Sequence, residues 1–216
     1  MVTVAPDYSP SAIHADYHQP IRIGTDAALA LAMCKVIVDG ELYKKEFVQE
    51  QTDLPLLVRK DNGRFLRGCD VNEGDREDQF YWWDMLTGAL TQAPRHTLAT
   101  MGADPALEGC FLATLKDGSS VEVEPVFVRL RRHLEDYTPE KAAEICQLHP
   151  DNIRKLARKV ATRKTKIFIG WNSGKYYHGD LMERAMALLL GLTGNWGKKG
   201  TGTRSWPSWD WTPRPS

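Results

Sequence analysis

The chain has 216 residues, so it is long enough to bury a core without disulfides or metal ions. Its residues are 42% hydrophobic and 26% charged, as in an ordinary globular protein. Its 28 Lys and Arg residues balance 28 Asp and Glu residues, which argues against nonspecific binding of nucleic acid. The longest apolar run, 185–190, is far too short to cross a bilayer, so we expect no direct insertion into a membrane.

The first part of the chain predicts a strand, a polar loop and two helices. Val2–Val4 alternates β-branched residues and predicts a short buried strand, and no signal peptide is expected there. Residues 27–38 are almost wholly apolar and predict a buried helix, with Thr25 or Asp26 as its N-cap and Gly40 at its end. A shorter, more exposed helix is expected at 42–51.

The middle section predicts two hairpins. Residues 54–68 surround an Asn62-Gly63 pair, which supplies the positive φ of a tight turn, and residues 111–123 repeat this pattern. Segments 72–78 and 92–106 carry turn residues without periodicity and predict irregular loops. We expect the section at about 54–125 to be a β-hairpin insertion.

The last part predicts three helices, at 126–134, at 139–148 after an N-cap at Thr138, and from Pro150 onward. The third helix has charged residues opposite its apolar face, namely Arg154, Lys155, Arg158 and Lys159. We interpret the basic face from Arg154 to Lys164 as a solvated helix surface. A strand at 166–170, a polar loop at 171–179 and an apolar helix at 180–193 follow. The strand–loop–helix order therefore occurs near both ends of the chain.

Two loops between a strand and a helix carry candidate ligand-binding residues. The first has Asp7 and Ser9 after the strand and Gly24, Thr25 and Asp26 at the helix start, the place where α/β sheets bind nucleotides. No GxGxxG or phosphate-loop motif is present, so an ordinary connection is the competing interpretation.

The second loop could admit an anionic ligand closely, because its glycines leave space and Lys175 can neutralise a phosphate. Its residues are Gly170, Trp171, Asn172, Ser173, Gly174 and Lys175. His178 could donate to a bound anion, although a solvated role is equally compatible. No metal site is expected, since His14 and His18 lie outside any helical pattern and the four cysteines are far apart.

Together these segments resemble the catalytic subunits of molybdopterin oxidoreductases related to dimethyl sulfoxide reductase. The matching segments are 4–9, Ala15-Asp16, 20–29, 137–158 and 192–200. Phe47-Val48 and residues 52–59 further resemble the branch that contains nitrate reductase alpha, nitrite oxidoreductase, and the perchlorate, selenate and ethylbenzene-type subunits.

The resemblance implies an α/β fold with a doubly wound, mostly parallel, Rossmann-like sheet. Residues 1–204 would form an incomplete domain for molybdopterin guanine dinucleotide, two copies of which carry molybdenum in these enzymes, and 205–216 a Trp/Pro-rich tail leading to a missing region. By analogy, Asp7 and Ser9 lie near the guanosine or its phosphates, and Gly24, Thr25 and Asp26 lie at the guanine. Gly170 to Lys175 would face a pterin or the pyrophosphate, with His178 also at the cofactor.

The family's subunits are several times longer and carry ligands for a [4Fe-4S] cluster and for molybdenum that this sequence lacks. We therefore expect an internal fragment or truncated reading frame, inactive alone and without catalytic residues, from an enzyme of nitrite or nitrate type. The implied partners are the rest of the catalytic subunit, an iron-sulfur electron-transfer beta subunit and a small oxyanion. The implied location is the periplasm or the cytoplasmic face of a bacterial membrane.

Two alternatives remain open at the level of sequence. The chain could be a stand-alone, non-catalytic α/β module that binds a nucleotide or assists assembly. Less favoured is a carbohydrate-binding surface formed by the Trp-rich tail.

Overall fold

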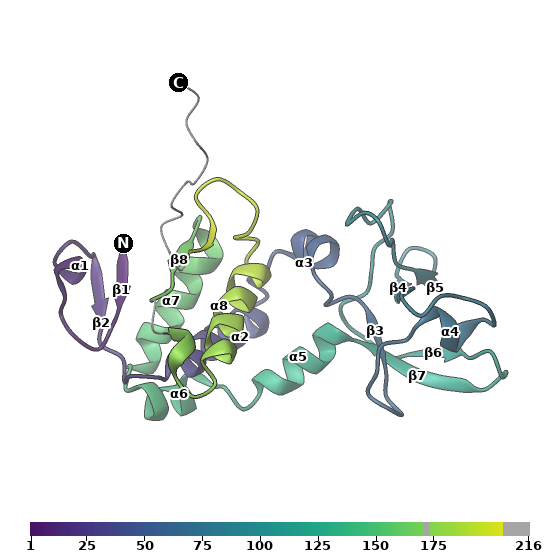
Figure 1. Cartoon of the computed structure of the whole chain (residues 1–216), viewed down its shortest axis with the longest axis horizontal. Helices are drawn as coiled ribbons and strands as arrows, with labels where there is room; N and C mark the ends of the chain where they lie inside the picture. The colour runs from purple at the N-terminus through teal and green to yellow at the C-terminus, as the bar shows by residue number, and fades with distance from the viewer. Residues whose placement is uncertain (171–172, 205–216) are drawn as a thin grey trace, which may run out of the picture. The chain divides into compact units, whose positions relative to one another are not determined.

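The structure is a computed structural model that describes residues 1–170 and 173–204. It divides the chain into two compact units: unit 1 contains Met1–Gly40 and the described residues from Tyr137 onward, and unit 2 contains Glu41–Asp136. The chain contains both helices and short strands (Figure 1), which confirms the α/β class predicted from the sequence.

Unit 1 has a core of four packed helices. They are α2 (Asp26–Asp39), α6 (Pro139–Cys146), α7 (Pro150–Thr162) and α8 (Gly179–Leu192). The apolar α2 packs against each of the other three, and it lies alongside α8 in Figure 1. Side chains such as Ile37, Ile153 and Leu190 are fully buried there, which explains why α2 lacks a polar face.

The helix ends follow the predicted capping chemistry at Thr138 and Gly40 but not at Thr25. Thr138 caps α6, since its hydroxyl accepts the Lys141 amide at 3.2 Å, and Gly40 follows the last residue of α2. Thr25 is the N-cap residue of α2, but its hydroxyl donates to the Arg22 carbonyl at 2.6 Å and leaves the first amides of the helix free of a side-chain cap.

The described strands of unit 1 pair in parallel, but they form two small sheets where the sequence predicted one doubly wound sheet. β1 (Val2–Val4) pairs with β2 (Tyr17–Gln19), with the short α1 (Pro10–Ile13) between them, and β8 (Lys166–Phe168) pairs with β9 (Gly202–Arg204). The prediction that Val2–Val4 is buried is wrong, because β2 is the one strand among the described residues that pairs with it, and its two valines are more than a third exposed.

A buried asparagine joins three elements of unit 1. The Asn195 amide donates to the Val160 carbonyl and to Thr193 Oγ1, both at 2.9 Å, and its oxygen accepts the Thr165 amide at 2.8 Å. The Asn195 carbonyl also accepts the Gly202 amide at 2.9 Å, which fixes the start of β9. Every polar group of this side chain is thus satisfied, as burial requires.

Unit 2 is built on an antiparallel sheet with the order β3-β7-β6. These strands are β3 (Leu57–Arg59), β7 (Ser120–Pro125) and β6 (Phe111–Thr114). Leu57, Leu66 and Val123 are fully buried between the two predicted hairpins. Along the chain, the short α3 (Lys45–Gln51) precedes the first hairpin and the short α4 (Gly68–Val71) follows it. The helix α5 (Val126–Leu134) has the predicted bounds.

One hairpin of unit 2 was not predicted. β4 (Tyr81–Asp84) pairs antiparallel with β5 (Ala89–Gln92). The turn between them contains the apolar residues Met85 and Leu86, so the segment carries a weak turn signal. The Asn62-Gly63 turn is confirmed, because Gly63 has φ +73° and the Arg59 amide donates across the turn to Arg64 at 2.8 Å.

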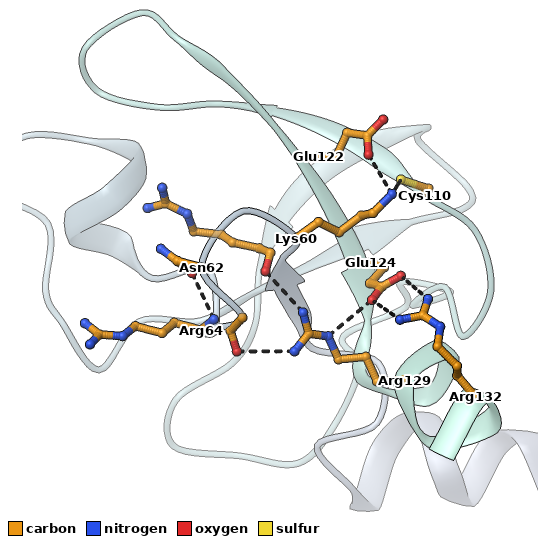
Figure 2. A network of polar contacts seen from close by, with 10 residues as sticks. Lys60, Asn62, Arg64, Cys110, Glu122, Glu124, Arg129 and Arg132 are labelled. Atoms are coloured by element: carbon orange, nitrogen blue, oxygen red, sulfur yellow. Dashed lines mark hydrogen bonds and ion pairs between the residues drawn. The ribbon is translucent and has the colours of Figure 1, made fainter. Parts of the chain in front are cut away.

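A buried carboxylate ties α5 to β7 (Figure 2). Glu124 is only 3% exposed and accepts hydrogen bonds from Arg129 at 3.2 Å and from Arg132 at 3.0 Å. Arg129 also donates to the Arg59 and Gly63 carbonyls, both at 3.3 Å. Burial raises the pKa of Glu124, but the two guanidinium groups outweigh it and hold that pKa below its usual value.

Candidate functional site

The two loops singled out in the sequence meet in unit 1. Gly24 has φ +78°, and a Cβ atom at this residue would lie 3.8 Å from Cδ1 of Tyr176. The loop before α2 therefore lies against the loop before α8, and these two helices also pack on each other. Both helix N-termini consequently border one region, where free amides and helix dipoles favour a negatively charged ligand.

Asp26 is the carboxylate of this region. It is the first residue of α2, it is half-buried, and no described residue forms a salt bridge with it. Burial raises the pKa of its carboxyl group. A carboxylate that lacks an internal partner can accept two N–H donors from a ligand such as the edge of a guanine ring.

The loop segment around Asp26 is anchored by backbone contacts. The Arg22 amide donates to the Cys146 carbonyl at 3.1 Å, which holds the segment against the end of α6. Burial, with a smaller contribution from the negative charge of Asp26, raises the pKa of the Cys146 thiol, so this thiol stays protonated. In the described part of the chain no cluster of His, Cys, Asp or Glu side chains could hold a metal ion.

The second loop is tied back onto α8. The Ser173 hydroxyl lies 2.8 Å from the Gly170 carbonyl and 2.9 Å from a carboxylate oxygen of Glu183, and Ser173 to Lys175 form one turn of 3₁₀ helix. A Cβ atom at Gly174 would lie 3.4 Å from Glu183 Oε1. Trp171 and Asn172, which were predicted to face the cofactor, lie outside the described residues.

A glycine is required where this loop enters α8. A Cβ atom at Gly179 would lie only 2.6 Å from the carbonyl carbon of Gly174, so no larger residue fits. His178 precedes it as the N-cap residue, in the left-handed region at φ +58°, with its ring 4.0 Å from that of Tyr177. Lys175 is exposed, and no described residue forms an ion pair with it.

Asp7 and Ser9 lie between β1 and α1. The Ser9 amide donates to the Asp7 carbonyl at 3.0 Å, and the Ser9 carbonyl accepts the Ala12 amide at 2.8 Å. Within the described ranges, no hydrogen bond or ion pair joins either residue to Gly24–Asp26 or to Ser173–His178. The structure thus brings Gly24 to the second loop and leaves Asp7 and Ser9 without a direct link to it.

Two residues of this region were missed by the sequence analysis. Tyr176 covers Gly24, and Glu183 holds Ser173. Tyr176 lies inside the polar loop at 171–179, so the sequence of that loop could have identified it as a site residue. Glu183 lies in the following helix, and its contact with Ser173 depends on how the loop folds back onto that helix.

Comparisons with known proteins agree on one family. The family model described as molybdopterin oxidoreductase matches residues 1–207. The chain is 40% identical to the dimethylsulfide dehydrogenase alpha subunit of Rhodovulum sulfidophilum, over 97% of this chain and 23% of the relative. It is 42% identical to the perchlorate reductase alpha subunit of Dechloromonas aromatica, over 94% of this chain and 25% of that protein.

Two further matches extend this result. The respiratory nitrate reductase alpha subunit of Haloferax mediterranei is 37% identical, over 93% of this chain and 22% of that subunit. The solved structure of acetylene hydratase from Pelobacter acetylenicus matches with a TM-score of 0.50 at 20% identity, over 92% of this chain and 18% of that chain, which supports a shared fold. The chain thus spans about a quarter of the length of the curated relatives it matches.

Proposed function

The chain belongs to the molybdopterin oxidoreductase family, among the catalytic alpha subunits related to dimethyl sulfoxide reductase, and we propose that it forms part of the site for the guanine dinucleotide form of the molybdopterin cofactor. The family implies a molybdenum-molybdopterin cofactor. The observation that carries the proposal is the contact between Gly24 and Tyr176, which joins the loops at the N-termini of α2 and α8.

The residues of this region fit a guanine nucleotide. Asp26 offers a half-buried carboxylate that forms no salt bridge within residues 1–170 and 173–204, which suits the N–H donors of guanine. Gly24 has no side chain and lies against Tyr176, which brings the second loop close to the start of α2. Lys175 offers an ammonium group that forms no ion pair with a described residue and can neutralise a phosphate.

The remaining predicted residues complete the proposed site. Gly170, Ser173 and Gly174 would let the pterin or pyrophosphate approach the backbone, and His178 would donate to it. Asp7 and Ser9 would contact the guanosine or its phosphates. Trp171 and Asn172 belong to the same proposal. When bound, the cofactor supplies two-electron chemistry at molybdenum, while these residues bind and orient it.

The whole enzyme is proposed to act on a small oxyanion of the nitrite or nitrate type. Support comes from the relatives named nitrate reductase and perchlorate reductase. The proposal includes that this chain works as part of a longer catalytic subunit with a middle β-hairpin insertion, and is inactive alone. It also includes an iron-sulfur beta subunit, as the relatives are named alpha subunits.

A binding experiment on the chain tests this proposal. GDP contains the guanosine and pyrophosphate of the cofactor, so isothermal titration should detect GDP binding that is at least tenfold tighter than ADP binding. Asp26→Asn should weaken GDP binding at least tenfold, since a hydrogen bond to a charged group contributes about 1.5–3 kcal/mol. Glu144→Gln removes an exposed carboxylate of unit 1 that pairs with no residue the structure describes, and it should leave GDP binding unchanged.

Two outcomes would contradict the proposal. Equal affinity for GDP and ADP would argue against guanine recognition. Unchanged GDP binding in the Asp26→Asn variant would argue against Asp26 as the residue that recognises the base, and the contact between the two loops would then need another explanation.

A further inference from the structure

The carboxylate of Glu183 reaches back from α8 to the loop that precedes this helix. Glu183 lies in the second turn of α8, is half-buried, and forms no salt bridge with any residue in 1–170 or 173–204. Its carboxylate lies 2.9 Å from the Ser173 hydroxyl, ten residues earlier in the chain. A half-buried carboxylate with a neutral hydroxyl as its partner adds no ion pair to the fold, so its contribution lies in its contact with the loop.

This contact closes the base of the loop, which we define as Ser173, Gly174 and Gly179. The Ser173 amide and hydroxyl both lie within hydrogen-bonding distance of the Gly170 carbonyl, at 3.0 and 2.8 Å. A Cβ atom at Gly179 would overlap the Ser173 carbonyl oxygen, so the two ends of the loop touch. Glu183 therefore fastens a closed loop to the helix that follows it.

The loop tip, residues 175–178, carries side chains that are proposed to meet the cofactor. All four residues of the tip are exposed. Lys175 follows Ser173 by two residues in the same 3₁₀ turn, and Tyr176 lies against Gly24. A segment with few buried side chains opens easily, so its conformation depends on the hydrogen bonds at its base. The position of Lys175 thus follows from the position of Ser173.

We infer that Glu183 is a positioning residue for the cofactor: through Ser173 it holds Lys175 where the ammonium group meets the pyrophosphate. The inference rests on the proposed cofactor site. Glu183 does not bind the anion itself, because a carboxylate repels a phosphate. A loop that is ordered before the ligand arrives loses less freedom on binding. A loop that adopts the binding conformation for about a fifth of the time would bind about fivefold more weakly.

The number of protons at Ser173 predicts which substitutions preserve the contact. The hydroxyl has one proton but two neighbouring acceptors, the Gly170 carbonyl and the Glu183 carboxylate. Glu183→Gln supplies an amide that can accept this proton, or can donate to Ser173 Oγ while the hydroxyl donates to Gly170. Glu183→Ala can do neither. The glutamine variant should therefore keep the loop in place, and the alanine variant should release it.

Isothermal titration of the full chain with GDP tests the inference. Glu183→Ala and Ser173→Ala should each weaken GDP binding at least fivefold. The double variant should lose no more than either single variant, because both substitutions remove the same contact. Glu183→Gln should stay within twofold of wild type. Glu144→Ala is the matched control, since it removes an exposed carboxylate of α6 that pairs with no described residue, and it should also stay within twofold.

Two further measurements separate positioning from general stabilisation. Lys175→Ala should weaken GDP binding at least fivefold in the wild-type background but less than twofold in the Glu183→Ala background, because Lys175 is no longer held at the phosphate there. Without ligand, trypsin should cleave after Lys175 at least fivefold faster in Glu183→Ala than in Glu183→Gln, since cleavage follows the population of the open loop.

Several results would overturn the inference. Additive losses in either pair of substitutions, or failure of Glu183→Gln to keep GDP binding, would exclude a positioning role. Equal cleavage of Glu183→Ala and Glu183→Gln would show that Glu183 does not hold the loop. If Glu183→Ala fails to fold by circular dichroism, Ser173→Ala removes the same contact from the loop side. A wild-type chain that does not bind GDP would refute the proposed function, whereas the cleavage rates, measured without ligand, test Glu183 separately.

Discussion

Replacing Glu124 by glutamine is expected to destabilise the chain by about 2 kcal/mol at neutral pH. The substitution keeps the size and one acceptor oxygen but removes the charge that receives Arg129 and Arg132. Hydrogen bonds to charged groups contribute about 1.5–3 kcal/mol each. We discount their sum because the side chains of Arg129 and Arg132 are 35% and 60% exposed and water screens them.

The difference in stability between wild type and Glu124→Gln should become smaller as the pH falls. Although burial raises the pKa of Glu124, the arginines lower it overall, so the folded pKa lies below the unfolded value of about 4.5. Stability from this group is therefore fully present above the unfolded pKa and is lost as pH falls through the folded pKa. The gap between wild type and Glu124→Gln should close on acidification.

Urea unfolding followed by tryptophan fluorescence measures this gap. Glu122→Gln is the matched control, since Glu122 lies two residues away on β7 and pairs with Lys60 at 2.6 Å, but its side chain is 57% exposed. That variant should lose less than about 0.5 kcal/mol. Equal losses in the two variants, or a Glu124→Gln gap that stays constant from neutral to acidic pH, would refute the reasoning.

Three further substitutions test other parts of the structure. Gly179→Ala should displace the loop that precedes α8, because its Cβ would overlap the backbone of Gly174, and faster tryptic cleavage after Lys175 would report this; a cleavage rate equal to wild type would contradict the close contact. Asn195→Ala should lower the free energy of unfolding by about 2 kcal/mol, since it removes the partners of the Val160 carbonyl and the Thr165 amide, whereas the Thr193 hydroxyl still donates to the Leu189 carbonyl; a loss below about 0.5 kcal/mol in urea would argue that water replaces the amide. Gly63→Ala should cost about 1 kcal/mol through its φ of +73°, measured in the same way, and a neutral result would mean that the turn adopts another conformation.

The sequence predicted best those elements whose pattern is local. The helices α2, α5 and α7 follow from apolar spacing and end signals, and the Asn62-Gly63 turn follows from the backbone freedom of glycine. The β4–β5 hairpin and the three-residue β9 were missed because neither carries a distinctive local signal. The first residue of β9, Gly202, donates to the carbonyl of Asn195, which follows α8, so the position of this strand depends on a contact outside the strand itself.

In the candidate site, too, local features could be predicted from the sequence, whereas contacts between distant segments could not. Gly24 and Asp26 could be found from the sequence, because a glycine before a helix and a carboxylate at its first turn are local features. The contact of Gly24 with Tyr176 joins residues far apart in the chain and could not be found from either segment alone. Likewise, the hydrogen bond between Glu183 and Ser173 follows from the fold of the loop between them.

The discontinuity of unit 1 constrains the order in which the chain can fold during synthesis. Unit 2 is a single continuous segment and can fold as soon as Asp136 has left the ribosome, whereas the helices that pack on α2 are made only afterwards. Until then the apolar α2 has no partner among α6, α7 and α8. An early folding of unit 2 shortens this interval of exposure, because a folded insertion holds its two ends at a fixed separation and lowers the entropy lost when they are brought together. Slow folding of unit 2 would therefore leave α2 open to aggregation or to chaperones, although no residue of α2 had changed.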